Sequence, residues 1–214
     1  MAARQQHGFE YEKHYSNKSG ILLWEEYAKK YPTQSTDQLY TSVWDGIDER
    51  QPGIHYNGKP VQIKCIGIGN AVDLGDIFRN SDKSENFDLV VSFRDSTLGG
   101  LGIVEEYVIP VDCNKWNDLL KYDKYDEWKN FITNEVSNDY SYDQTWKIEK
   151  NKRMDDWGRD RLIQPRFKRD HKNQRRIQCS IPNKIFYNYF IVSNVVTEEG
   201  KSILTYKKEV HEFF

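Results

Sequence analysis

The sequence predicts one mixed α/β domain, and three observations lead to this fold class. The chain has 214 residues, which is enough to bury a sizeable hydrophobic core. Helical patterns mark its beginning and residues 114–136, whereas apolar runs of strand length lie between them. Charged residues make up 30% and hydrophobic residues 37% of the chain, a composition typical of globular proteins with a polar bias.

The first third of the chain predicts two helices followed by two strands. Residues 8–31 read as helical in two pieces with a break near residues 17–20, and Pro32 stops the second piece. Residues 38–44 and 60–68 are predicted strands joined by a turn-rich loop. Residues 67–80 read as a short helix or loop.

The remaining elements are predicted in the same way. Residues 87–95 form a fully buried strand and residues 105–112 another, followed by the helical stretch 114–136. Weak periodicity over 147–184 predicts loops and short elements, and 184–196 with 202–214 read as a closing pair of strands. The single domain 1–214 thus divides into a core of about 1–135, a basic segment of about 147–184 and closing strands of about 185–214.

Composition excludes several classes of protein. No stretch approaches the roughly 20 apolar residues of a membrane span, and the first 15 residues lack the apolar core of a signal peptide. Cys65, Cys113 and Cys179 are far apart and odd in number, which indicates reduced thiols and no zinc spacing. We therefore expect a cytoplasmic protein without membrane partners.

Charge is distributed unevenly along the chain. Of 31 basic and 33 acidic residues in total, residues 147–184 hold thirteen and five, which leaves 18 and 28 for the rest. A basic segment on an acidic protein suits a polyanion such as a nucleic acid. Aromatic, Gln and Asn residues interleave with these charges, as phosphate contact combined with base reading requires. The competing interpretation is a solvated charged surface.

Polar residues interrupt the apolar strand Val61–Ile66. Because side chains alternate along a strand, Gln62 and Lys64 point to the same face. A buried lysine requires an anion, and Asp45, expected to close the neighbouring strand before Gly46, is the candidate. The competing interpretation is an edge strand with one solvated face, where lysine protects against edge pairing.

Asp45 and Gln62-Ile63-Lys64 resemble the motif of the PD-(D/E)XK nucleases, a superfamily that includes many type II restriction endonucleases and Mrr-like enzymes. The segment "HGFEYEKHY" is similar to the N-terminal helix of Mrr-like members, with Glu12 at the position that reaches the metal. Glu10 is the less favoured alternative on that helix. The resemblance covers about the first third of the chain and, more loosely, the strand at 87–95.

The resemblance implies a restriction-endonuclease-like core, with a central mixed sheet flanked by helices and a basic DNA-recognition segment. It also implies Mg²⁺ bound by Asp45, Gln62 and Glu12, with Lys64 acting on the attacking water or the phosphate. One position departs from the usual pattern, because Gln62 replaces a carboxylate and brings one negative charge fewer to the metal. Glu12 would supply the missing charge.

These features predict a Mg²⁺-dependent, sequence-specific endonuclease of double-stranded DNA, a type II restriction enzyme acting as a homodimer. Two alternatives stay open: a structure-specific DNA repair nuclease, and a catalytically inactive DNA-binding protein that keeps the nuclease fold. The residues expected to face DNA lie in the basic segment and combine types that suit guanine and adenine: Arg166, Lys168, Arg169, Lys172, Asn173, Gln174, Arg175 and Arg176.

Overall fold

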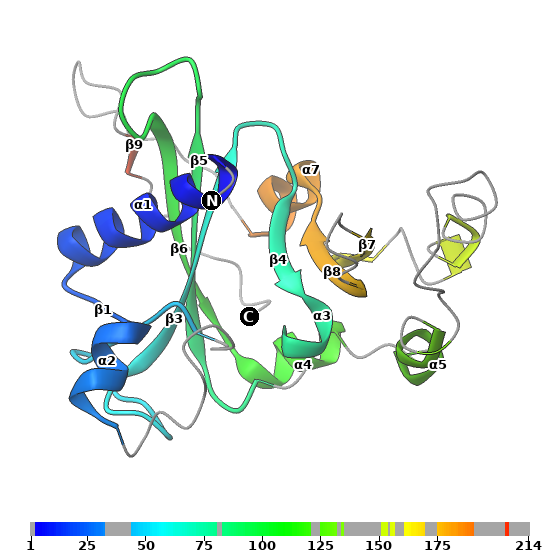
Figure 1. Cartoon of the computed structure of the whole chain (residues 1–214), viewed down its shortest axis with the longest axis horizontal. Helices are drawn as coiled ribbons and strands as arrows, with labels where there is room; N and C mark the ends of the chain where they lie inside the picture. The colour runs from blue at the N-terminus through cyan, green and yellow to red at the C-terminus, as the bar shows by residue number, and fades with distance from the viewer. Residues whose placement is uncertain are drawn as a thin grey trace.

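The structure is a computed structural model, and it describes residues 3–32, 44–80, 83–120, 125–131, 134, 151–153, 155–156, 161–169, 175–190 and 204–205. Two β-sheets organise these residues (Figure 1). The larger has six strands in the order β1-β2-β3-β5-β6-β9, and the smaller has three in the order β4-β8-β7. The fold class is therefore α/β, as predicted.

The six-stranded sheet is mixed. Strand β3 (Lys59–Gly67) lies between β2 (Gly46–Asp48), which is antiparallel to it, and β5 (Phe87–Arg94), which is parallel. The remaining strands are β1 (Leu22–Leu23), which pairs with β2, and β6 (Ile103–Val111) and β9 (Leu204–Thr205), which follow β5. A parallel pair inside a sheet has both faces covered, and both faces of β3 and β5 carry helices or strands.

Helix α1 (Ala3–Ser19) covers one face of this sheet, and α2 (Trp24–Lys30) follows it after β1 (Figure 1). Tyr11 and Tyr15 of α1 pack in one buried cluster with Ile63 of β3 and Val90 of β5. The helix ends at Gly20, which has a φ of +73° and donates its N–H to the carbonyl of Ser16 at 2.8 Å. Glycine adopts this left-handed conformation without steric cost.

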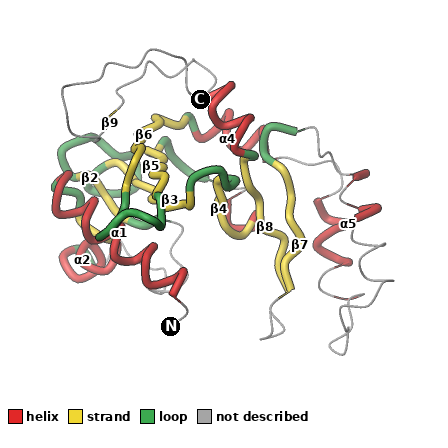
Figure 2. Tube along the Cα trace, turned by 90° about the horizontal axis from the view of Figure 1, so that it is seen from above, coloured by secondary structure: helices red, strands yellow, loops and turns green. Residues whose placement is uncertain are grey.

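The opposite face packs against the smaller sheet and two helices (Figure 2). Leu89 and Val91 of β5 share a core with Leu74 of β4 (Val72–Asp76) and Ile177 of β8 (Arg175–Ile181). Helices α3 (Ile77–Asn80) and α4 (Cys113–Leu120) contribute Ile77 and Trp116 to the same core. The other elements are α5 (Tyr125–Asn130), β7 (Gln164–Arg169), α7 (Asn183–Ile185) and the π-helix η2 (Phe186–Phe190).

Most predicted elements of the core are confirmed in the described residues. The helical stretch 8–31 breaks at Gly20 as expected, and the predicted strands at 60–68, 87–95 and 105–112 correspond to β3, β5 and β6. Helices α4 and α5 lie within the predicted helical stretch 114–136. No helix in the described part of the chain is long and apolar enough to cross a membrane.

The strand that carries Asp45 was predicted in the wrong place. Asp45 precedes β2 and does not close a strand, and the predicted residues 38–43 lie outside the described ranges. Gly46 lies within β2, where a Cβ would approach the carbonyl oxygen of Leu22 to 2.7 Å, so glycine permits the close pairing with β1.

Predictions for later segments are confirmed only in part. Residues 67–80 contain the short helix α3, but residues 72–76 form strand β4, which was not predicted. The described part of the basic segment contains the short strands β7 and β8, which pair with one another. Residues 183–190 are helical, because Phe186 packs against Phe93 and Tyr107 with ring centroids 5.5 and 5.7 Å apart. Strand β9 pairs in parallel with β6 instead of closing a hairpin.

Candidate functional site

Asp45 is fixed by its backbone directly before β2, between β3 and the first residue of α2. Its N–H donates to the carbonyl of Val61 at 3.0 Å, and its own carbonyl accepts from the N–H of Trp24 at 3.1 Å. The carboxylate oxygen Oδ2 accepts two further hydrogen bonds, from the backbone N–H of Ile63 at 2.6 Å and from Nζ of Lys64 at 3.0 Å. The predicted pairing of Asp45 with Lys64 is therefore present.

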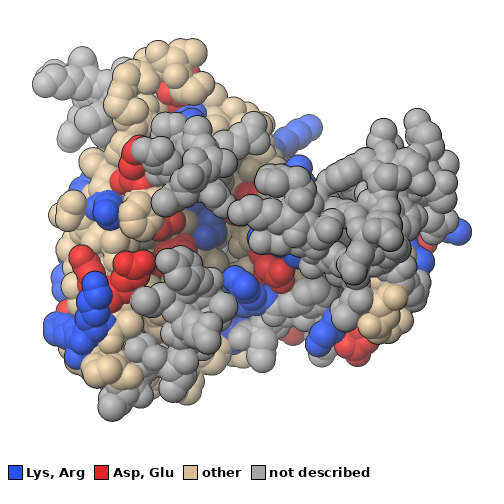
Figure 3. Space-filling model, in the orientation of Figure 1, with Lys and Arg blue, Asp and Glu red and all other residues tan. Residues whose placement is uncertain are grey.

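Strand β3 presents Gln62 and Lys64 to the face that holds Leu89 and Val91, their partners in register on β5. Gln62 is only 5% exposed, and the side chain of Lys64 is 20% exposed. The interpretation of this segment as an edge strand with a solvated face is therefore wrong. Acidic and basic side chains lie side by side around the middle of the face shown in Figure 3.

The amide of Gln62 is oriented by Asn80 at the end of α3. Nδ2 of Asn80 donates to the carbonyls of Leu74 at 3.0 Å and Asp76 at 2.7 Å. These two bonds fix the orientation of the amide, so that Asn80 presents the acceptor Oδ1 to Gln62. Nε2 of Gln62 donates to this Oδ1 at 3.1 Å. The other amide atom of Gln62, Oε1, is buried and has no hydrogen-bond partner. A buried acceptor without a donor is costly, which favours a ligand for this oxygen.

Glu12 of α1 lies within electrostatic range of the same group. Its pKa is raised to about 7, first by burial and then by the negative charge of Asp45, whereas the positive charge of Lys64 acts in the opposite direction. No described residue forms a hydrogen bond or ion pair with this carboxyl. Glu10, the alternative on the same helix, is exposed. Of the two, Glu12 is the carboxyl that interacts with Asp45 and Lys64.

This donor set fits a hard divalent cation. Asp45 and Glu12 provide two carboxylates, and Gln62 provides an amide oxygen held in place by Asn80. Both hydrogen bonds to Asp45 go to Oδ2, so within the described residues Oδ1 is left for a ligand. Among the described residues no three His, Cys, Asp or Glu side chains form a metal site on their own. A cation bound here would therefore take Gln62 Oε1 as its third protein oxygen.

The residues predicted to face DNA belong to the β7–β8 pair. Arg166 is exposed on β7, opposite Gln178, and the register places Lys168 opposite Arg176 and Arg169 opposite Arg175. Lys172, Asn173 and Gln174 lie outside the described residues.

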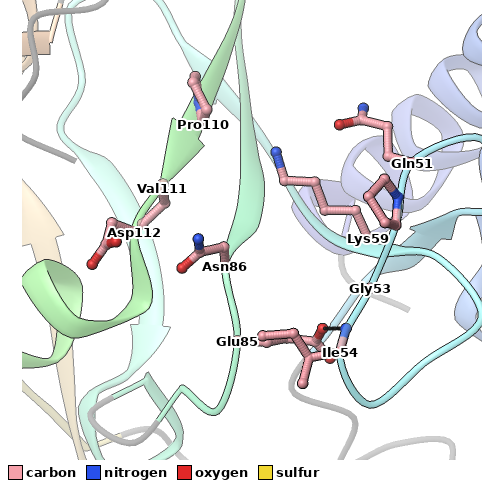
Figure 4. Close-up of a pocket in the computed structure, with 10 residues that line it drawn as sticks. Gln51, Gly53, Ile54, Lys59, Glu85, Asn86, Pro110, Val111 and Asp112 are labelled. Atoms are coloured by element: carbon pink, nitrogen blue, oxygen red, sulfur yellow. Dashed lines mark hydrogen bonds between the residues drawn. The ribbon is translucent and has the colours of Figure 1, made fainter.

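A separate cavity of about 420 Å³ lies near the beginning of β3 and contains none of the predicted site residues (Figure 4). One oxygen of Glu85 accepts from the backbone N–H of Ile54 at 2.7 Å, and the other is buried without a hydrogen-bond partner. Lys59 extends across the cavity and forms an ion pair with Asp88. Glu85 thus attaches residues 54–55 to the sheet.

Sequence reasoning missed two residues beside the site, Asn80 and Lys83. Asn80 orients Gln62, and Lys83 is a buried lysine within electrostatic range of Lys64 and Asp45. Neither belongs to a local motif, because each reaches the site through tertiary packing from about 20 residues further along the chain.

Comparisons of the chain with protein-family models, with curated proteins and with solved structures gave no match. The site is therefore interpreted from its own geometry.

Proposed function

We propose that this protein is a Mg²⁺-dependent endonuclease that hydrolyses phosphodiester bonds in double-stranded DNA. One observation carries the proposal: Gln62 Oε1 is held without a partner on the same strand as Lys64, which is paired with Asp45. Two oxygen donors and an ammonium group on one short stretch of backbone suit a metal ion and a phosphate together.

Asp45, Gln62 and Glu12 would hold the metal. When bound, Mg²⁺ would polarise the scissile phosphate and lower the pKa of a bound water. Asp45 is positioned for this role by the N–H of Ile63, and Gln62 is positioned by Asn80. Glu12, whose pKa is about 7, would bind as the carboxylate and lose its proton when a cation approaches.

Lys64 would act on the substrate. Its ammonium lies 3.0 Å from Asp45 Oδ2, and its side chain is partly exposed, so it can reach both the carboxylate and a bound anion. In that place it would orient the attacking water and stabilise the negative charge that develops on the phosphate in the transition state.

The β7–β8 pair would contribute DNA contacts, with Arg166 as its exposed described member. Arginine binds phosphates and, in the major groove, guanine. We propose further that the enzyme reads sequence as a type II restriction endonuclease and acts as a homodimer, because two-fold symmetry places one site on each strand.

An inactive DNA-binding protein is the second candidate, and Gln62 is the observation that favours it. An amide brings no negative charge to the metal, so the site has one carboxylate fewer than the motif it resembles. The ion pair between Lys64 and Asp45 also neutralises both charges within the protein itself.

Incubation of the protein with long duplex DNA in Mg²⁺, in Ca²⁺ and in EDTA separates these candidates, with Asp45→Ala purified in parallel as the control for contaminating nuclease. Discrete fragments in Mg²⁺ alone, absent with the variant, are the expected result. A smear would instead indicate a nuclease that reads shape. DNA that is retarded on a gel but stays intact under every condition would support the inactive DNA-binding protein.

A further inference from the structure

Glu85 places a buried carboxylate in the wall of the cavity near the beginning of β3 (Figure 4). The residue is 1% exposed. Its oxygen Oε2 accepts from the backbone N–H of Ile54 at 2.7 Å and from that of His55 at 3.5 Å. The other oxygen, Oε1, is buried and has no hydrogen-bond partner. A buried acceptor without a donor is costly, so this carboxylate favours a ligand that can donate to it.

The charges in the cavity wall favour a cation. Lys59, the basic residue of the wall, already pairs with Asp88. Asp112 adds a second carboxylate to the wall, and its Oδ1 accepts from the backbone N–H groups of Asn114 and Lys115, each at 3.0 Å. The two carboxylates of the wall thus outnumber its single ammonium, and the charge of that ammonium is balanced by Asp88.

The geometry of Glu85 distinguishes between kinds of cation. Mg²⁺ and Ca²⁺ take several oxygen ligands, and among the described residues no three His, Cys, Asp or Glu side chains form a group that could hold a metal. A guanidinium binds a carboxylate best through both oxygens, but Ile54 and His55 already occupy Oε2. An ammonium is a compact charge that can bind through one oxygen, and Oε1 is that oxygen.

Apolar side chains supply the other part of the wall. Pro52 and Ile54 precede β3, and Pro110 and Val111 end β6. The cavity volume of about 420 Å³ is within the range of small-molecule sites, roughly 300–1,000 Å³. Burial of a short hydrocarbon chain against these residues would stabilise a complex. The wall therefore suits a ligand with an apolar stem and a charged end.

We propose that this cavity binds an aliphatic ammonium, the group that ends a lysine side chain or a polyamine, and that Glu85 Oε1 accepts its hydrogen bond. The cavity contains neither Asp45 nor Lys64. The proposal therefore goes beyond the proposed nuclease function and does not depend on it.

The probe is n-butylammonium, which carries one ammonium on a short hydrocarbon chain. Binding to the full chain is followed at constant ionic strength by nuclear magnetic resonance of the isoleucine δ1-methyl groups. Ile54 is 74% exposed, so its signal can be assigned by its absence from Ile54→Val without disturbing the core. We expect this signal to shift saturably with the probe. The signal of Ile68, which is 53% exposed and outside the cavity, should not shift.

Glu85→Gln tests the carboxylate itself. Glutamine keeps an oxygen for the N–H groups of Ile54 and His55 but loses the charge. Binding of n-butylammonium should weaken roughly tenfold, as the loss of a charge-assisted hydrogen bond predicts. Glu26→Gln is the matched control, because it changes the net charge equally at an exposed residue of α2 outside the cavity. Affinity should not change in this control.

The ligand chemistry is tested on the wild type. Pentanoate, which has a similar chain and the opposite charge, should not shift the Ile54 signal, and n-butylguanidinium should bind no more tightly than n-butylammonium. An Ile54 signal that ignores n-butylammonium or responds equally to pentanoate would overturn the inference, as would equal affinity in Glu85→Gln and the wild type. If Glu85→Gln does not fold, the two probes still decide.

Spermidine and an acetylated lysine amide distinguish the two sources of the ammonium. Tighter binding of spermidine would identify a polyamine as the ligand, and tighter binding of the lysine amide would identify a lysine side chain of a protein. Either result supports the cavity as an ammonium site, whereas failure of both to shift the Ile54 signal would reject it.

Discussion

Strand β3 carries two lysine–aspartate pairs in different surroundings. Lys59, at its beginning, pairs with Asp88 of β5, and both side chains are at most 17% exposed. Lys64, five residues later, pairs with Asp45 at 3.0 Å, and these side chains are 20% and 26% exposed. By residue type and geometry alone, either pair qualifies as a structural ion pair.

The neighbours of the two pairs distinguish them. Asp88 also accepts from Nε2 of Gln51 at 3.4 Å, and Gln51 in turn donates to Asp48, so the first pair belongs to a hydrogen-bonded network. Each pair has a buried oxygen without a partner nearby, on Glu85 for the first and on Gln62 for the second. The second pair differs because Glu12, with a raised pKa, and Lys83, with a lowered pKa, interact with it. Such perturbed groups cluster at functional sites. An ion pair alone therefore does not identify the site, whereas its neighbours do.

Substitution of the two lysines tests this comparison with the largest expected effect. Lys64→Met should reduce the rate of DNA cleavage by about 10²–10⁴-fold, because it removes the group that acts on water or phosphate. Lys59→Met should leave the rate within a few fold of wild type. Single-turnover cleavage assays of both variants measure the difference.

Stability should change in the opposite order. Lys59→Met leaves Asp88 mostly buried without its cation, which should cost about 2 kcal/mol of unfolding free energy. Lys64→Met should cost less than about 1 kcal/mol, because Asp45 is more exposed and keeps the N–H of Ile63. Urea unfolding measures both. Equal cleavage rates for the two variants would remove the distinction between the pairs.

Gln62→Glu sharpens the contrast through Asn80. A carboxylate at this position would face Oδ1 of Asn80, which is also an acceptor. The Asn80 amide cannot rotate to present Nδ2 instead, because Nδ2 donates to the carbonyls of Leu74 and Asp76. We expect a loss of about 1–3 kcal/mol in EDTA and partial recovery in Mg²⁺, measured by thermal unfolding. The double variant Asp45→Ala/Gln62→Glu should show no recovery, and equal recovery there would argue against a metal at this site.

Glu12→Gln changes the pH dependence of stability. The folded-state pKa of about 7 exceeds the ordinary 4.5, so between these values the folded protein keeps a proton that the unfolded chain releases. The unfolding free energy of the wild type should therefore fall as pH rises from about 4.5 through 7, by on the order of 1–3 kcal/mol. Glu12→Gln should remove this fall.

Glu10→Gln is the control for this experiment, because Glu10 lies on the same helix but is exposed. Its unfolding free energy should follow the wild-type pH profile. If the pH dependence of the unfolding free energy disappears in Glu10→Gln but not in Glu12→Gln, then Glu10 and not Glu12 is the carboxyl near Asp45.

Arg166→Ala should have the smallest effect. Loss of one phosphate contact should weaken DNA binding by about 1 kcal/mol and reduce by about one the slope of log affinity against log salt. Lys29→Ala, exposed on α2 and outside the basic segment 147–184, is the matched control. Fluorescence anisotropy in Ca²⁺ at several salt concentrations measures both, and equal losses would indicate an unspecific charge effect.

The sequence predicted the elements whose hydrophobic pattern is local. Strand β5 has a continuous apolar run at its centre and α2 has a four-residue repeat ended by Pro32, so both were placed correctly. Strand β8 was missed because its apolar residues follow two arginines and alternate with Gln178 and Ser180. The helix η2 was missed because contacts of Phe186 with Phe93 and Tyr107 override the strand propensity of "FYNYF".

In the candidate site too, the residues placed by a local pattern were predictable and those placed by tertiary contacts were not. Alternation along β3 placed Gln62 and Lys64 on one face, and charge complementarity selected Asp45 as the partner of Lys64. Asn80 and Lys83 were not predictable, because α4 brings them to the site through contacts from Trp116 and Asn117. Such contacts have no periodic signature in the sequence.

Binding of Mn²⁺ to the wild type, Asp45→Asn and Asp88→Asn tests the central claim most directly. Mn²⁺ prefers the same oxygen ligands as Mg²⁺, and the free ion is counted by electron paramagnetic resonance. We predict that the wild type and Asp88→Asn bind the ion and that Asp45→Asn does not. No binding to the wild type, or equal binding to the wild type and Asp45→Asn, would contradict the assignment of a metal to the site around Asp45 and Lys64.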